Sequence, residues 1–155
     1  MSYSDDVLAA GEAFAAFLET LSPEPFRHSP SPEAWSAAEI AGHAAEFPVT
    51  FARQCVALAA TPGLHVGRAL DDPGRLAALE RTHGMSPAEA AAAIRAVTAE
   101  AAAILATVPV GGWDAVGVHP RFGEFPNRRI AEDFIRDHLR GHLAEARAAA
   151  AAAVP

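Results

Sequence analysis

Two histidines, His138 and His142, lie one helical turn apart in the segment AEDFIRDHLRGHLAEAR, and a third, His43, lies far upstream. Residues four apart on an α-helix share one face, with Cβ atoms about 5–6 Å apart, so both imidazoles can reach one ion. A histidine from a neighbouring helix would complete the set. Three such ligands suit zinc, nickel, copper or iron, and they leave coordination positions open for water or substrate. The pattern therefore predicts a metal site with His43, His138 and His142 as ligands.

Two acids are candidates to support these ligands. Glu145 follows His142 by three residues, on the same stripe of its helix, and Glu46 follows His43 by three. Imidazoles on an inward stripe are costly to bury unless something pairs with them, and a metal ion would pair with all three. Either glutamate can orient an imidazole or move a proton, and the alternative for each is a solvated helical acid.

The remaining histidines and the single cysteine carry no comparable pattern. His28, His65, His83 and His119 lie beside proline, glycine or polar residues, where we expect solvated imidazoles. Cys55 lies on an apolar helical stripe and has no second cysteine to pair with. We therefore expect a packed core thiol without a function of its own.

Four helical segments must position the three ligands, because apolar residues recur with helical spacing and no window shows the sustained alternation of a strand. The expected segments are residues 5–21, 36–58, 86–107 and 128–152. At 155 residues the chain has the length of one domain, which we assign to residues 1–155. The predicted fold is all-α, a four-helix bundle with one or two long crossover connections.

Short sequence signals mark the ends of these helices. Ser36 with Glu39, and Ser86 with Glu89, have the spacing of capping boxes at helix N-termini. Pro48 lies one turn after the His43 position, where it removes a backbone donor and predicts a kink near the site.

Three stretches rich in proline and glycine are expected to connect the helices. They are residues 23–35, residues 61–84 with a short helix from Pro73 to Arg81, and residues 109–127 folded over one end of the bundle.

Composition excludes several classes of function. The formal net charge is −7 and the chain has no lysine, which argues against a nucleic-acid surface, a P-loop and Schiff-base chemistry. No stretch approaches the roughly 20 large apolar residues of a membrane span. Acids stand near the N-terminus where a secretory signal carries basic residues. We therefore expect a cytoplasmic protein that binds neither nucleic acid nor membrane.

The same residues carry a family resemblance. Trp35, Ser36, Glu39 and His43 have the spacing W-S-x-x-E-x-x-x-H, which resembles the opening of the second helix in the DinB-like superfamily. The segment RFGEFPNRRIAEDFIRDHLRGHLAEAR is similar to that superfamily's last helix and the loop before it. The resemblance implies a four-helix bundle with a three-histidine divalent-metal site, often nickel or zinc, and frequently a homodimer. His43 and the two histidines of the last helix match the family's ligands.

Characterised relatives in this superfamily include transferases that use bacillithiol or mycothiol and an isomerase branch that uses mycothiol. The resemblance therefore implies a metal-dependent S-transferase that joins a mycothiol-type thiol to a small electrophilic substrate. The sequence departs from many relatives at Gly141 and Ala144, where a second histidine or a glutamine is frequent. Two alternatives stay open, a metal-dependent hydrolase that activates water and a non-enzymatic dimeric bundle that binds a metal or a small molecule.

Overall fold

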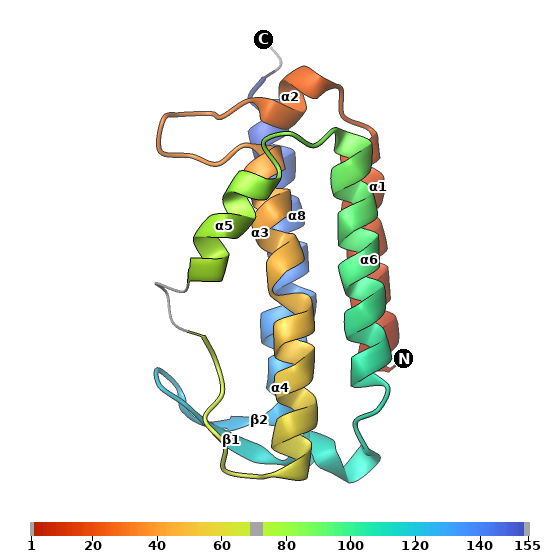
Figure 1. Cartoon of the computed structure of the whole chain (residues 1–155), viewed down its shortest axis with the longest axis vertical. Coiled ribbons are helices and arrows are strands. Elements are labelled where there is room, and N and C mark those ends of the chain that lie inside the picture. Colours follow the sequence, from red (N-terminus) through yellow and green to blue (C-terminus); the bar gives the residue numbers. More distant parts are fainter. Residues whose placement is uncertain (1, 69–72, 154–155) are drawn as a thin grey trace.

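The computed structural model describes residues 2–68 and 73–153, and its long helices lie side by side along one axis (Figure 1). These helices are α1 (Tyr3–Glu19), α3 (Ala37–Glu46) continued by α4 (Pro48–Ala60), α6 (Pro87–Leu105) and α8 (Asp137–Ala151). Helices α1 and α8 run in one direction, and α3, α4 and α6 run in the other (Figure 1). The predicted all-α four-helix bundle is confirmed.

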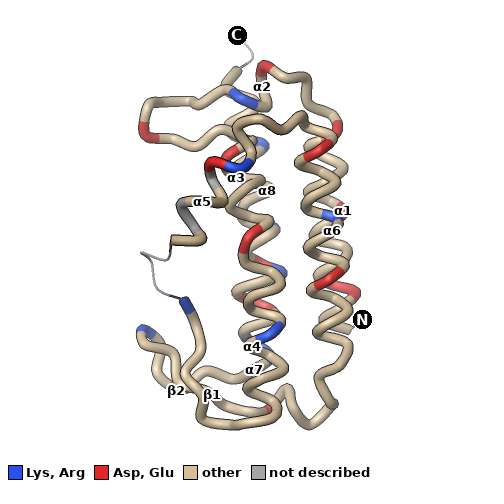
Figure 2. Tube along the Cα trace, viewed as in Figure 1, with Lys and Arg blue, Asp and Glu red and all other residues tan. Residues whose placement is uncertain are grey.

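Helices α1 and α6 pack closely because small residues face one another between them. A Cβ atom at Gly11 would lie only 2.4 Å from the Thr98 Oγ1 atom, so glycine is required for this approach. Outside this contact, Arg95 of α6 forms ion pairs with Glu12 and Glu19 of α1, where acidic and basic residues face one another (Figure 2). These three charges are therefore paired across the contact between the two helices.

The helix starts follow the predicted capping boxes. The Ser36 hydroxyl accepts a hydrogen bond from the Glu39 backbone N–H, and the Glu39 carboxylate accepts one from the Ser36 backbone N–H. Ser86 and Glu89 make the same reciprocal pair at the start of α6. A third capping box, formed by Ser2 with the acid three residues later, starts α1 at Tyr3, two residues before the predicted start.

The predicted kink at Pro48 is a break between two helices. Helix α3 ends at Glu46 and α4 begins at Pro48, with Phe47 between them in a helical backbone conformation. Proline has no backbone N–H to donate to the preceding turn, but its fixed φ suits the first position of a new helix. The break therefore occurs one turn after His43.

Two short helices lie in the connections. Helix α5 (Pro73–Arg81) has the predicted bounds. Residues 69–72 of the same connection lie outside the described residues. Helix α2 (Pro23–Arg27) lies in the stretch that the sequence predicted as a loop. Its five residues are too few to show helical periodicity, and the buried Phe26 anchors it to the core.

The connection between α6 and α8 contains a β-hairpin that the sequence did not predict. After the 3₁₀ turn η1 (Val110–Asp114), strand β1 (Val116–His119) pairs antiparallel with β2 (Gly123–Pro126). Four-residue strands are too short to show an alternating pattern. The buried Asn127 amide donates hydrogen bonds to the Cys55 carbonyl of α4 and the Gly112 carbonyl of η1, which fixes the end of the hairpin to both elements.

The last predicted helix is continuous but not uniformly α-helical. It comprises α7 (Asn127–Arg129), the π-helical segment η2 (Ile130–Arg136) and α8. A π-helix is rare and is frequently found next to functional sites.

None of the described helices has the length and apolar character that a membrane span requires.

Candidate metal centre

Three histidines from two helices converge between α3 and α8. Each of His43, His138 and His142 offers one ring nitrogen, and these three atoms all lie within 4.8 Å of one another. The ring centroids of His43 and His142 are 4.8 Å apart, and those of His138 and His142 are 4.4 Å apart. His43 and His142 are buried, whereas His138 is partly exposed. The three predicted ligands therefore form one cluster that can hold a metal ion.

The His142 ring is held by Glu145 in the orientation that a metal ligand requires. The Nδ1 atom of His142 lies 2.7 Å from the Glu145 Oε2 atom. Because a carboxylate only accepts hydrogen bonds, Nδ1 is the donor in this contact, and in the neutral imidazole Nε2 then keeps a free lone pair. The Nε2 atom is buried and has no hydrogen-bond partner among the described residues. An ion bound by this lone pair would compensate the cost of burying it, so the residues fit a metal.

Aromatic side chains form the wall around the three imidazoles. The Phe47 ring stacks on His138, with centroids 4.0 Å apart and an angle of 14° between the planes. On the other side, the Trp35 ring centroid is 5.2 Å from that of His43. Sequence reasoning missed both contacts, although Phe47 follows His43 by four residues and so shares its helical face. These rings restrict the imidazoles and exclude water from part of the cluster.

A chain of stacked rings connects this wall with the β-hairpin. Phe51 of α4 contacts Phe134 of η2, and Phe134 stacks on Phe125 of β2 with centroids 5.0 Å apart. His119 of β1 packs against the same rings instead of pointing into solvent as expected, and burial together with nearby Arg121 lowers its pKa. The hairpin thus supports η2, which leads into the helix that carries His138 and His142.

The two candidate acids lie in different surroundings. Glu145 contacts an imidazole directly, while its side chain is 60% exposed. The Glu46 carboxylate forms an ion pair with Arg68, and its side chain is only 8% exposed. Glu145 is therefore placed to orient a ligand and exchange protons with solvent. Glu46 is held in a buried charge pair, and its part in the reaction stays a prediction.

The histidines and the cysteine for which the sequence predicted no function lie outside the cluster. His28 is partly exposed, His83 is exposed, and the backbone of His65 pairs with Val118 beside the hairpin. The Cys55 side chain is fully buried, and burial raises the pKa of its thiol to about 12. The prediction of a packed core thiol is confirmed.

A surface groove of about 440 Å³ lies beside the cluster. It is lined by residues of α3, α8 and the segment before α3, namely Pro30, Glu33, Ala34, Trp35, Ile40, Glu145, Ala148 and Ala149. Trp35 contacts His43 of the cluster, and Glu145 contacts His142. The groove therefore gives a small molecule a place to bind next to the candidate metal centre.

The comparisons with known proteins agree with this architecture. A family model described as the DinB superfamily matches residues 8–146, which is most of the chain and includes all three histidines. No curated protein matches the chain.

Proposed function

Because the chain belongs to the DinB superfamily, we propose that it is a divalent-metal-dependent enzyme that transfers a low-molecular-weight thiol of the mycothiol type to a small electrophile. Nickel and zinc are the ions we expect, since both accept three imidazole ligands. The observation that carries the proposal is the buried Nε2 atom of His142, which Glu145 leaves in the ligand tautomer within the three-histidine cluster.

The thiol in this proposal comes from a cosubstrate. Cys55 is the only cysteine of the chain, and burial raises its pKa to about 12. A buried, protonated thiol is a poor nucleophile because the thiolate is the reactive form. The protein therefore needs a small thiol that enters from solvent.

Each group at the site then has a distinct role. A divalent ion held by His43, His138 and His142 supplies the positive charge that lowers the pKa of a cosubstrate thiol. Glu145 keeps His142 oriented and, being largely exposed, can pass a released proton to solvent. The groove beside Trp35 holds the electrophile, whose carbon forms a bond to sulfur as its bond to the leaving group breaks, and the leaving group departs with the bonding electrons.

Turnover with and without a thiol tests the proposal. The protein is loaded with nickel or zinc and incubated with a chromogenic aryl halide, alone and with mycothiol. We expect product only when both metal and thiol are present, and we expect none from the His142→Ala variant. Turnover that is independent of the thiol would contradict S-transfer and indicate metal-dependent hydrolysis. Metal binding without turnover of any substrate would favour the non-enzymatic alternative.

A further inference from the structure

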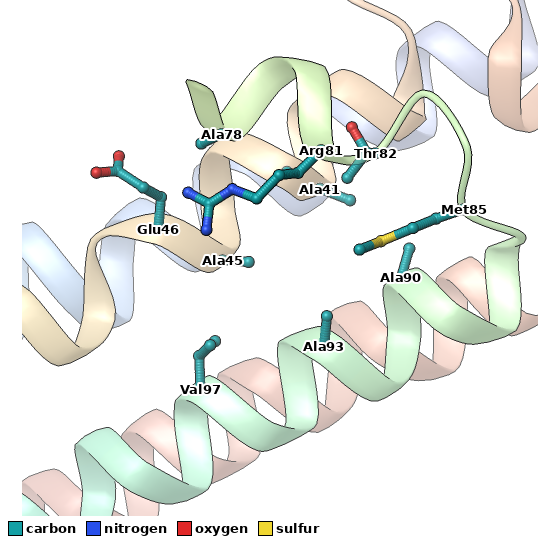
Figure 3. Close-up of a pocket in the computed structure, with 11 residues that line it drawn as sticks. Ala41, Ala45, Glu46, Ala78, Arg81, Thr82, Met85, Ala90, Ala93 and Val97 are labelled. Atoms are coloured by element: carbon teal, nitrogen blue, oxygen red, sulfur yellow. The ribbon is translucent and has the colours of Figure 1, made fainter. Parts of the chain in front are cut away.

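A second cavity lies between α3, α5 and α6, away from the α3–α8 face that carries the histidine cluster (Figure 3). Its volume is about 140 Å³. The lining is mostly aliphatic, formed by Ala41, Gly42, Ala45, Ala78, Met85, Ala90, Ala93 and Val97, with Glu46, Arg81 and Thr82 as the polar members. The cavity is therefore a small apolar chamber with a few charged groups.

The cavity exists because α5 approaches α3 closely while small side chains face α6. A Cβ atom at Gly42 would lie 2.6 Å from the Ala78 carbonyl oxygen and 2.8 Å from Thr82. Glycine at this position thus allows the two helices to touch. The alanines on the other walls leave space that larger side chains would fill. The cavity therefore depends on the small residues at these positions.

The charged groups beside the cavity include one arginine with no ion pair among the described side chains. Glu46 forms an ion pair with Arg68, and the two charges cancel. Arg81 extends from α5 along the cavity in the direction of Glu46 (Figure 3). Arg81 is solvent-exposed, and among the side chains that the structure describes its guanidinium has no ion pair or hydrogen bond. The cavity therefore combines an apolar interior with an available cation.

We propose that this cavity binds a small apolar monocarboxylate. The apolar part of this ligand lies among the alanines and Val97. Its carboxylate pairs with the Arg81 guanidinium, whose planar donors suit bidentate binding. The volume of about 140 Å³ limits the apolar part of the ligand to roughly one ring, since apolar cavities of about 150 Å³ hold benzene. This site is separate from the metal centre and does not depend on its function.

Methionine-methyl NMR with benzoate as the probe tests the proposal. The full-length protein, labelled at its methionine methyl groups, contains only Met1 and Met85, so the cavity residue Met85 has an internal reference. Benzoate should shift the Met85 signal to saturation and leave that of Met1 in place. Benzyl alcohol, which lacks the carboxylate, should bind about tenfold more weakly, because a charge-assisted pair is lost.

Three variants define the site. Arg81→Gln should weaken benzoate binding about tenfold. The matched control Arg53→Gln, which changes an arginine paired with Glu100 outside the cavity, should bind like the wild type. Ala93→Leu should fill the cavity and abolish the Met85 shift while circular dichroism shows an intact fold.

Two results would overturn the proposal. One is a Met85 signal that benzoate does not move, and the other is wild-type binding by Arg81→Gln. The His142→Ala variant should keep the benzoate response, so failure of the metal centre and failure of this site are distinguishable.

Discussion

At the scale of single residues, the contact between Glu145 and His142 sets the chemistry that the cluster can perform. The carboxylate holds the proton on Nδ1 and so leaves Nε2 as a ligand. Without this partner the imidazole could turn or adopt the other tautomer. The contact therefore links an exposed surface acid to the buried candidate metal centre.

We expect Glu145→Gln to lower zinc affinity by about 10–100-fold, because removal of a carboxylate behind a histidine ligand has effects of this size. Competition with a chromogenic chelator measures the change. Glu100→Gln, which alters an exposed acid paired with Arg53, is the matched control and should bind zinc like the wild type. Equal affinity in both variants would show that Glu145 is only a solvated acid.

The Cys55 thiol should be unreactive in the folded protein. It is fully buried, and its pKa is raised to about 12. Dithionitrobenzoate at mild alkaline pH should release no colour from the native protein over a period in which the urea-unfolded protein reacts completely. Rapid reaction of the native protein would mean that the chain carries its own nucleophile, which would remove the need for a thiol cosubstrate.

The sequence could predict some of these residues and not others. The spacing of His138 and His142 on one helix made their proximity a matter of geometry. His43 was predicted as the third ligand from the sequence pattern, and the family resemblance supported this assignment. The difference between Glu46 and Glu145 could not be predicted, because it depends on Arg68, which lies in an irregular connection whose path the sequence does not determine.

At the scale of elements, glycines determine how closely the helices pack. Gly11→Ala should destabilise the protein by about 1–3 kcal/mol, because the new methyl group would overlap Thr98. Gly141→Ala is the matched control, since nothing lies within 4 Å of its Cβ position and alanine should stabilise α8 by up to about 1 kcal/mol. Urea unfolding measures both changes. Stabilisation in both variants would contradict the close approach of α1 and α6.

The capping box of α6 should make stability depend on pH in the acid range. Hydrogen bonds from the Ser86 backbone N–H and hydroxyl lower the pKa of Glu89 from 4.5. The folded state therefore binds this proton more weakly than the unfolded state. The contribution is complete above pH 4.5 and is lost as the pH falls through the lower folded-state pKa.

Thermal melts of the wild type and Glu89→Gln over a pH series measure this contribution. The variant should be less stable at neutral pH, and the difference should disappear in acid. Other carboxylates titrate equally in both proteins, so the comparison isolates Glu89. A difference that does not change with pH would show that the carboxylate charge has no role in the cap.

Helix starts were predictable because capping depends on residues three apart, as at Ser36 and Ser86. The β-hairpin and the π-helical segment η2 were not, since both depend on contacts between distant parts of the chain. The hairpin is fixed to α4 by the hydrogen bond from Asn127 to the Cys55 carbonyl. The ring of Phe134 in η2 packs against Phe51 and Phe125, from two other elements.

At the scale of the whole molecule, the bundle brings together the two sequence segments that carry the family resemblance, one around His43 and one around His138 and His142. Helix α3 carries one ligand and α8 carries two, and these helices are separated in the chain by α4, α5, α6 and the hairpin. An ion bound by all three histidines would join the two helices and stabilise the folded state over the unfolded chain. Assembly as a homodimer stays a prediction of the family resemblance.

The metal content of untagged protein tests the central claim most directly. Elemental analysis after loading with nickel or zinc and removal of free ions is performed on the wild type, His43→Ala and His138→Ala, with circular dichroism to verify folding. We expect about one ion per wild-type chain and almost none in either variant, because two imidazoles hold an ion much less tightly than three. Equal metal in folded variants, or none in the loaded wild type, would contradict a three-histidine metal centre.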